Sequence, residues 1–279
     1  MIQIKTEAEI ALMRQAGLVV GRTLEKLKAA ARPGMTTADL DAIAEESIRG
    51  EGAIPSFLGY RGFPARICTS INAEIVHGIP STKAVIKSGD IVPIDCGAIV
   101  DGYHGDAAVT VPVGDVRPEL LELLRVTEES LWHGIAAARL GGRLIDISRG
   151  VEDYIRSQRH PFADRFGGAS WGIVEEYVGH GIGTEMHQDP QVYNYVGRRM
   201  AKGPELVKGL ALAVEPMVNL GSRATRVLDD GWTVVTEDGF PSAHFEHTFT
   251  LTERGPWVLT ALDGGEARLA ALGALQATA

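Results

Sequence analysis

The chain carries one order of short motifs twice, and this repeat constrains its fold more than any other feature. The sequence Ala30-Ala-Arg-x-Gly34 recurs as Ala137-Ala-Arg-x-Gly141, at an offset of 107 residues (137 − 30). Farther along, Asp95 corresponds to Glu215 at an offset of 120 residues (215 − 95). Helices and strands share composition, so single matches are weak evidence. The unchanged order of all the matches favours an internal duplication.

Each repeat reads as helix, helix and antiparallel strands, and the two repeats carry matching acidic motifs, His104-Gly-Asp106 in the first and His244-Phe-Glu246 in the second. Two such halves would place their carboxylates around a shared axis. The sequence therefore predicts one α+β catalytic domain over residues 1–279, with halves of roughly 6–115 and 116–255 and a site between them. The Ala-rich end, residues 266–279, is predicted to be a flexible tail.

Helix signals are clear in both halves. Thr6 and Glu9 form a predicted capping box, and the apolar period after them predicts a helix that ends at Pro33-Gly34. Further helices are predicted over 37–49, 118–140 and 145–159. Strands are predicted near 67–70, 74–77, 172–178, 211–214, 232–236 and 244–252, and residues 56–64 read as a loop rich in glycine and aromatic residues.

One hairpin carries the first two acidic candidates. The β-rich run from Ile91 turns at Asp101-Gly102 and resumes up to Val113, and a D-G between such runs is a strong hairpin signal. Asp95 and Asp106 then lie on paired strands among apolar neighbours. An ionised carboxylate there is costly unless a cation or hydrogen bonds compensate it. A bound metal would also remove the repulsion between the two carboxylates.

Composition excludes several classes of protein. A net charge of −9 without a Lys/Arg cluster argues against a nucleic-acid partner. No apolar run approaches membrane-spanning length, and the charged start does not resemble a signal peptide. Two cysteines, Cys68 and Cys96, are too few for a disulfide framework. A cytoplasmic protein without a membrane or nucleic-acid partner is expected.

Five residues form the candidate metal-binding set: Asp95, Asp106, His180, Glu215 and Glu246. Four carboxylates and one imidazole suit divalent cobalt, manganese or iron, with zinc or magnesium as alternatives. Four negative charges exceed what one divalent ion neutralises. Two ions about 3.5–4 Å apart, bridged by carboxylates, would balance them and generate hydroxide from water at neutral pH.

Each candidate also has an ordinary structural interpretation. Asp95 and Asp106 could stabilise turns, Glu246 could form a surface salt bridge, and His180 could be a core histidine. Glu215 follows Leu-Ala-Leu-Ala-Val, where a glutamate is rarely buried without a partner. Considered one at a time, only Asp95 and Glu215 favour metal binding over the ordinary interpretation. Considered together, all five residues favour metal binding.

Other histidines are less certain from pattern alone. His77 and His187 are candidate catalytic residues, and surface exposure is the alternative for both. His104 and His244 are expected beside the ligands and receive no role. The glycine-rich segment 179–183 lacks the Lys-Ser/Thr and the helix of a phosphate-binding loop, so that function is rejected.

With these residues in place, the sequence resembles the type I methionine aminopeptidases over nearly its whole length. The matching stretches are His77-Gly-Ile-Pro, Asp95 through Asp106, Gly179-His180-Gly-Ile-Gly, Met186-His187-Gln-Asp-Pro, Glu215-Pro-Met-Val-Asn and Glu246-His-Thr. The resemblance implies a pseudo-twofold "pita-bread" fold, an antiparallel sheet with two pairs of helices and a dinuclear metal site between the halves. It also implies removal of the initiator methionine from nascent polypeptides whose second residue is small.

The resemblance also assigns roles. Asp95, Asp106, His180, Glu215 and Glu246 would bind two divalent ions, with Asp106 and Glu246 bridging them. Glu215 would also act as general base toward the attacking water or hydroxide. His187 would stabilise the tetrahedral intermediate, and His77 would lie near the scissile amide nitrogen. A free substrate α-amine would complete the coordination of one ion.

The methionine pocket follows the family less closely. Tyr60, Cys68 and Trp232 match pocket positions of the bacterial enzymes. Phe57 replaces a usually small residue, Phe63 a tyrosine and Met186 an aromatic residue. The pocket is therefore expected to be narrower and apolar, which suits a flexible thioether. A monomer is expected, and transient association with ribosomes is left open.

Two other functions remain in competition. Proline-specific peptidases of the prolidase or aminopeptidase P kind share the ligand order, but normally carry a large amino-terminal domain, and only 56 residues precede Phe57. A pseudo-enzyme that serves as a protein- or ribosome-binding module would be expected to lose ligands, and this chain retains all five.

Overall fold

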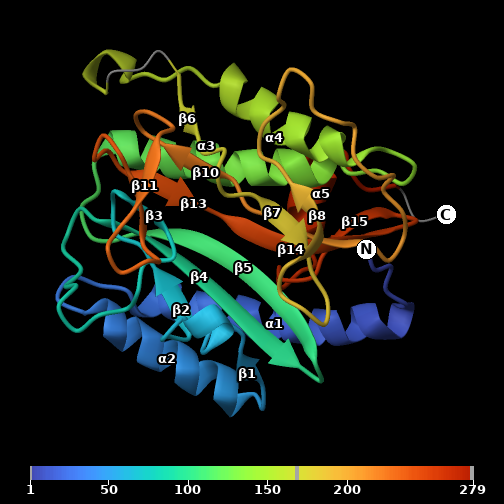
Figure 1. The fold of residues 1–279 in the computed structure, drawn as a ribbon, viewed down its shortest axis with the longest axis horizontal. Coiled ribbons are helices and arrows are strands. Elements are labelled where there is room, and N and C mark those ends of the chain that lie inside the picture. Colours follow the sequence, from blue (N-terminus) through green and yellow to red (C-terminus); the bar gives the residue numbers. More distant parts are fainter. Residues whose placement is uncertain (1, 167–169, 277–279) are drawn as a thin grey trace.

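The largest sheet has nine strands and runs between two pairs of helices (Figure 1). The computed structural model describes residues 2–166 and 170–276. Along the sheet the order is β1-β4-β5-β14-β9-β7-β8, with β2 paired to β4 and β15 to β14. Its strands are β1 (Ile54–Pro55), β2 (Ile67–Thr69), β4 (Ile91–Val100), β5 (Tyr103–Pro112), β7 (Gly179–Gly181), β8 (Gln188–Val192), β9 (Ala211–Val214), β14 (Glu246–Thr252) and β15 (Gly255–Val258).

Two three-stranded sheets complete the strand structure. One has the order β13-β10-β6 and the other β11-β12-β3, and neighbouring strands in both run antiparallel. Their strands are β3 (Glu74–Val76), β6 (Gly172–Ile173), β10 (Met217–Asn219), β11 (Thr225–Val227), β12 (Val234–Thr236) and β13 (Ser242–His244). The strand predicted over 172–178 is thus only two residues long, and Trp232 precedes β12 instead of belonging to it.

The predicted helices are confirmed within a few residues. They are α1 (Glu7–Ala30), α2 (Thr37–Gly50), α3 (Pro118–Ala137) and α4 (Leu144–Ser157), with 3₁₀ turns at Tyr60–Gly62 and Ala163–Arg165. Figure 1 shows α1 and α2 at one end of the molecule and α3 and α4 at the other. Among the described residues no helix combines the length and hydropathy needed to span a bilayer.

The amino-terminal ends of α2 and α4 are built alike. The Asp39 carboxylate accepts a hydrogen bond from the Thr36 backbone N–H at 2.8 Å, and Asp146 accepts one from Arg143 at the same distance. Each residue of the second pair lies 107 positions after its counterpart in the first pair, the offset of the sequence repeat. The preceding turns also correspond, since the Gly34 N–H donates to the carbonyl of Ile86 and the Gly141 N–H to that of Leu206. The fold therefore repeats in detail, as a pseudo-twofold arrangement requires.

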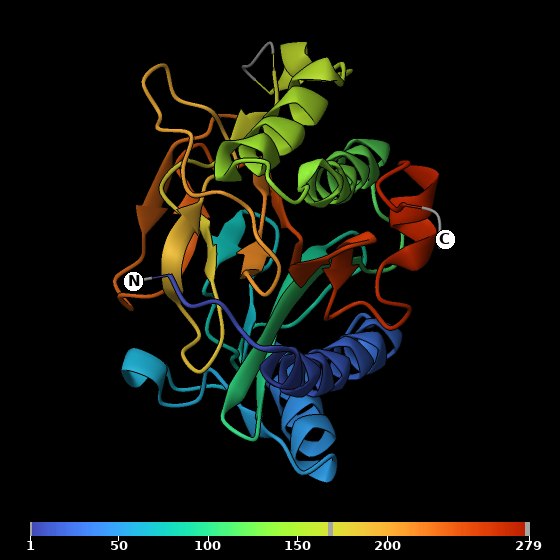
Figure 2. The ribbon, with the colours of Figure 1, turned by 90° about the vertical axis from the view of Figure 1, so that its right-hand side faces the viewer.

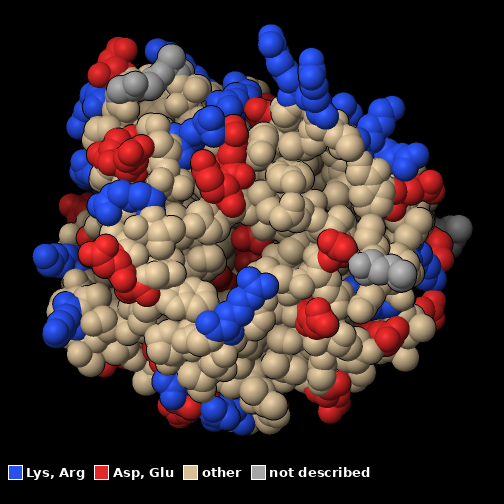
Figure 3. All heavy atoms as spheres, viewed as in Figure 1, with Lys and Arg blue, Asp and Glu red and all other residues tan. Residues whose placement is uncertain are grey.

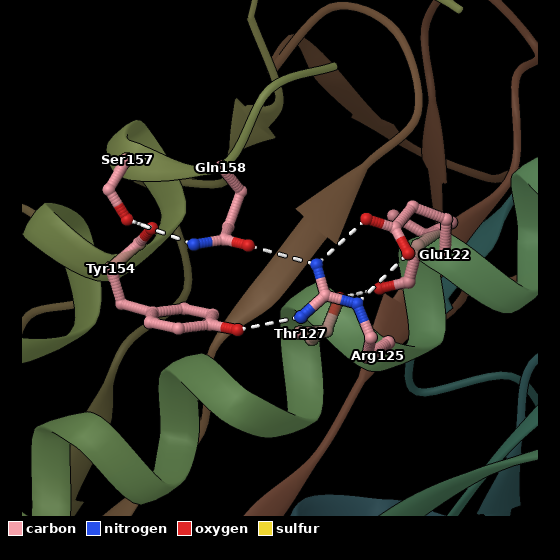
Figure 4. A network of polar contacts seen from close by, with 7 residues as sticks. Glu122, Arg125, Thr127, Tyr154, Ser157 and Gln158 are labelled. Atoms are coloured by element: carbon pink, nitrogen blue, oxygen red, sulfur yellow. Dashed lines mark hydrogen bonds and ion pairs between the residues drawn. The ribbon is translucent and has the colours of Figure 1, made fainter. Parts of the chain in front are cut away.

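Helix α3 is tied to α4 by one arginine (Figure 4). The Arg125 guanidinium donates to the hydroxyl of Tyr154 at 2.8 Å and to the side chain of Gln158 at 2.9 Å, and it also pairs with Glu122. All of these bonds lie at the surface, and none of the residues is a candidate ligand. They stabilise the second helix pair without taking part in the site.

Each helix pair covers its own apolar core. One core joins α1 and α2 to β4 and β5, and the other joins α3 and α4 to β9 and β14. Helix α1 approaches the hairpin very closely where two glycines meet. A Cβ added at Gly105 of β5 would lie 2.6 Å from the backbone nitrogen of Gly17 in α1. Figure 2 shows this helix running beside the hairpin.

The predicted flexible tail is wrong for the residues that the structure describes. Residues Glu266–Ala271 form helix α5, and the side chains of Leu269 and Ala274 are almost fully buried. The Arg268 guanidinium lies over the Trp132 ring of α3, 5.5 Å from its centroid. Packing on α3, which local sequence does not reveal, orders this segment; residues 277–279 of the predicted tail lie outside the described residues.

Candidate active site

The five candidate ligands come from five consecutive strands of the large sheet. In the order of the sheet they are Asp95 on β4, Asp106 on β5, Glu246 on β14, Glu215 directly after β9 and His180 on β7. Ligand atoms of Asp106, His180 and Glu246 lie within 4.8 Å of one another. The first two residues belong to the first half of the chain and the other three to the second half. The site therefore lies at the seam between the halves.

Register explains how the two aspartates meet. Asp95 is paired with Ala108, and Asp106 with Gly97, so the aspartates are diagonal neighbours on one face of the hairpin. Glu246 is also paired with Ala108, from the other side of β5. Because side chains alternate along a strand, all three carboxylates project from the same face.

The carboxylates of Asp106 and Glu246 are buried and those of Asp95 and Glu215 half-buried, and they lack enough partners of their own. Asp106 Oδ1, Asp95 Oδ1 and Glu246 Oε1 have no hydrogen-bond partner among the described residues. Burial raises the pKa of Asp95 to about 7, and it raises the pKa of Asp106, Glu215 and Glu246 well above their ordinary values, with mutual repulsion adding to the effect for these three. Such a set is unfavourable alone and fits divalent cations, which supply the missing positive charge.

His180 is oriented as a ligand. Its Nδ1–H donates to the carbonyl of Gly181 at 2.9 Å, which leaves the lone pair of Nε2 facing Glu215 Oε1 at 3.6 Å. Burial lowers the pKa of His180 to about 4, so this contact is not an ion pair at neutral pH. A neutral nitrogen facing a carboxylate oxygen fits a cation between them, and the backbone bond fixes the tautomer, as is usual for metal-binding histidines.

One cavity of about 150 Å³ contains every site residue that the sequence predicts. Its walls include the five candidate ligands, together with Phe57, Tyr60, Phe63, Cys68, His77, Met186, His187 and Trp232. Arg61 lines the same cavity and was not predicted. On the face shown in Figure 3 the molecule is hollowed near its centre, with acidic side chains visible inside the hollow.

The closed part of the cavity is apolar. Phe57, Phe63, Cys68 and Met186 are buried in one cluster, and Trp232 packs against it. The rings of Phe63 and Trp232 meet edge to face with centroids 5.1 Å apart. An unbranched apolar side chain would be enclosed here by aromatic rings and sulfur. The three residues that depart from the family pattern all belong to this wall.

The two candidate catalytic histidines face the same cavity. The ring of His77 meets Tyr177 edge to face at 5.6 Å, and burial lowers the pKa of His77. His187 is exposed at the opening, with its ring centroid 4.2 Å from that of His180. The exposure expected as the alternative for His187 is therefore present, but the exposed ring still lines the site.

A further histidine, His244, lies beside the candidate ligands, as expected. His244 is almost fully buried, and its Nε2 has no hydrogen-bond partner among the described residues. This nitrogen is 3.9 Å from Glu215 Oε2, and ligand atoms of Glu215, His244 and Glu246 lie within 4.8 Å of one another. The available signal was its position two residues before Glu246, although His244 ends β13 and Glu246 begins β14.

Comparison with known proteins agrees with this geometry. The model of metallopeptidase family M24 matches residues 11–253. A methionine aminopeptidase of Clostridium acetobutylicum is 51% identical over 260 residues, which cover 93% of this chain and 99% of that protein. Methionine aminopeptidase 1 of Bacillus subtilis is 48% identical over the same shares of the two chains.

Solved structures give the same result. The crystal structure of methionine aminopeptidase from Thermotoga maritima matches with a TM-score of 0.86 and 40% identity, over 94% of this chain and all of that one. An Xaa-Pro dipeptidase from Bacillus anthracis has a TM-score of 0.69 at 24% identity, and the match covers only 61% of its length. That second similarity shows the shared fold alone. The chain belongs to metallopeptidase family M24 and, within it, to the methionine aminopeptidases.

Proposed function

We propose that this chain removes the initiator methionine from nascent polypeptides whose second residue is small. The observation that carries the proposal is the single cavity in which a buried set of metal-binding side chains adjoins an apolar end. The apolar end suits the thioether side chain of methionine. The scissile bond would then lie between the carboxylates and the two histidines.

We further propose that the site holds two divalent ions, with cobalt, manganese and iron favoured and zinc or magnesium as alternatives. Asp95, Asp106, His180, Glu215 and Glu246 would hold them, and Asp106 and Glu246 would be shared between the two. Two divalent ions balance the charge of four carboxylates. When bound, they would supply Lewis acidity and lower the pKa of water enough to make it a nucleophile.

The protein side chains would perform the remaining tasks. Glu215, whose carboxylate lies in the cavity wall, would take up the proton that the attacking water loses. His187 would donate a hydrogen bond to the substrate carbonyl as negative charge develops on its oxygen. His77 would lie beside the scissile amide nitrogen. The enclosing aromatic wall would exclude water from the methionine side chain.

The proposed substrate also suggests where the protein acts. Polypeptides that still carry the initiator methionine are found in the cytoplasm, and we propose that this chain acts there. A monomer is sufficient, because the cavity is formed by residues of one chain. Nascent amino termini would be its partners, with transient ribosome association as an open proposal and no role for nucleic acid or membranes.

Hydrolysis of the tripeptide Met-Ala-Ser tests the function. Metal-stripped protein would be titrated separately with manganese, cobalt, zinc and, without oxygen, iron, while bound metal is counted. We expect turnover that appears with added metal and greatly exceeds turnover of an X-Pro dipeptide. Preference for the X-Pro dipeptide would favour a proline-specific peptidase. A folded protein that is inactive with every metal would favour the binding module.

A further inference from the structure

Tyr60 contacts His187 in a way that a pocket wall does not require. The Tyr60 hydroxyl oxygen lies 2.9 Å from His187 Nδ1. The two rings are also stacked, with centroids 5.4 Å apart and planes inclined by 23°. Tyr60 thus holds both the plane of the imidazole and one of its two nitrogens.

Either atom can be the donor of this hydrogen bond, and the choice decides the tautomer of His187. In a neutral imidazole one nitrogen carries the proton and the other accepts. Within residues 2–166 and 170–276 the Tyr60 hydroxyl has no second partner, so donation to Nδ1 is the arrangement that uses its proton. His187 then carries its own proton on Nε2. That proton is the one available for donation to a substrate oxygen.

The loop that carries Tyr60 is built to hold it in place. Gly59, Arg61 and Gly62 all have positive φ, at 83°, 50° and 89°. The loop closes on itself through hydrogen bonds from the Gly59 N–H to the Phe63 carbonyl at 2.8 Å and from the Phe63 N–H to the Tyr60 carbonyl at 2.9 Å. A left-handed conformation at a non-glycine residue is strained and persists only where the surroundings impose it.

Arg61 adds a second constraint on the same ring. Its guanidinium lies over the Tyr60 ring, 5.3 Å from the centroid. The phenol ring therefore contacts both a cation and an imidazole. These two contacts limit the orientation of the ring, from which the hydroxyl reaches Nδ1.

We propose that Tyr60 is a positioning residue that fixes the Nε2–H tautomer of His187 and so aims the proton of that nitrogen at the substrate carbonyl. This inference rests on the proposed function, because it takes the role of His187 from it. It differs from a pocket role, in which Tyr60 would contact only the methionine side chain. A pocket role affects substrate binding, whereas a positioning role affects the transition state.

The substitution Tyr60→Phe removes only the hydroxyl and keeps both ring contacts. With Met-Ala-Ser and manganese-loaded protein, we expect kcat to fall about 5- to 10-fold, the effect of losing one hydrogen bond, with KM changed less than about twofold. Tyr154→Phe is the matched control, because its hydroxyl bonds Arg125 on the surface. That control should keep wild-type kinetics. A raised KM with unchanged kcat in Tyr60→Phe would overturn the proposal.

A double-mutant cycle separates positioning from a general structural effect. In the His187→Ala background, adding Tyr60→Phe should change kcat by less than about twofold, since the group that Tyr60 orients is gone. A structural effect would instead lower kcat equally in both backgrounds. Equal losses would therefore contradict the proposal.

Nitrogen NMR reads the tautomer without any turnover. In zinc-loaded protein labelled with ¹⁵N-histidine, the His187 signals are those missing from His187→Ala. We expect wild type to show protonated Nε2 with Nδ1 as acceptor, and Tyr60→Phe to show a mixture of tautomers. A proton on Nδ1 in wild type, or an unchanged spectrum in Tyr60→Phe, would overturn the proposal. If wild type cleaves no Met-Ala-Ser, the proposed function fails and this spectrum alone decides whether Tyr60 sets the tautomer.

Discussion

Asp95 and Asp106 are diagonal neighbours on one face of the β4–β5 hairpin, with each aspartate paired to a residue that has a small side chain or none. Ala108 opposite Asp95 and Gly97 opposite Asp106 leave room for both carboxylates to lean toward the same space. The hairpin therefore brings two negative charges together at a buried position. The two neighbouring carboxylates destabilise the protein without metal, and they favour binding of divalent cations.

Asp106→Asn should separate the two effects of this carboxylate, which destabilises the metal-free protein and binds the metal. We expect loss of manganese binding and of turnover, because the shared ligand loses its charge. The metal-free variant should be more stable than metal-free wild type by about 1 kcal/mol or more, since a buried carboxylate has been neutralised. Isothermal titration and urea unfolding measure the two effects. Asp101→Asn, at the exposed hairpin turn, is the control, and manganese binding retained by Asp106→Asn would refute the assignment.

His187→Ala should act on the chemical step. Removing a donor to the developing oxyanion lowers kcat by roughly 10²-fold or more, and KM should change only a few-fold. Steady-state kinetics with Met-Ala-Ser measure both constants. His133→Ala, in which the lost ring stacks on Tyr154 away from the site, should leave them unchanged. An unaltered kcat in His187→Ala would return that histidine to an ordinary surface role.

Trp232→Ala should weaken selection for methionine. The lost ring packs edge to face on Phe63 and closes the apolar end of the cavity. We expect the ratio of kcat/KM for Met-Ala-Ser to that for Leu-Ala-Ser to fall about tenfold, a typical contribution of pocket packing. Trp257→Ala, at a tryptophan that lines a different cavity, is the comparison. The same ratio in Trp232→Ala and wild type would exclude the pocket role.

Lys5 should make stability depend on pH in the alkaline range. Its ammonium group bonds the carbonyl of Gln3 and the side chain of Gln188, and burial lowers its pKa from 10.5 to about 8. The unfolded chain therefore binds more protons than the folded chain between about pH 8 and 10.5, so this lysine's contribution to stability rises with pH there. Lys5→Met should lose that rise, measured by urea unfolding, whereas exposed Lys83→Met should keep it. An identical pH profile for Lys5→Met and wild type would contradict this prediction.

Gly105→Ala should destabilise the first half of the fold. The added methyl group would lie 2.6 Å from the backbone of α1, which cannot yield as a flexible side chain can. We expect a loss of about 1–3 kcal/mol in the free energy of unfolding. Gly50→Ala, at the end of α2 where an added Cβ meets no atom within 4 Å, should cost nothing. Equal stability of the two variants would refute the close contact.

Most of the fold could be predicted because its signals are local. The capping residues at Thr6 and Glu9 and the D-G turn at Asp101-Gly102 act over a few residues, and the structure shows each where expected. The five candidate ligands were recognisable for a related reason. A charged residue inside an apolar strand run, such as Asp95 or Glu215, contradicts its local environment unless something compensates it.

Contacts between distant segments could not be predicted in this way. The order of α5 depends on Arg268 lying over Trp132, a contact between residues 136 positions apart (268 − 132). The bond between Tyr60 and His187 likewise joins two loops, and neither loop indicates the other in its sequence. Arg61 was missed as a site residue because its positive φ, which aims it over Tyr60, is rare for arginine and has no sequence signal.

The seam between the halves has a consequence for how such a site could arise. Because ligands come from both halves, a half-length ancestor could have completed the site only as a symmetric homodimer, with two acidic strands from each copy. Such a dimer loses its site on dilution, whereas joining the two copies in one chain makes assembly independent of concentration. Covalent linkage also allows the two halves to differ in sequence, which the two subunits of a homodimer cannot do. Asp95 and Glu215, at matching positions of the two halves, differ in side-chain length, and so do Asp106 and Glu246.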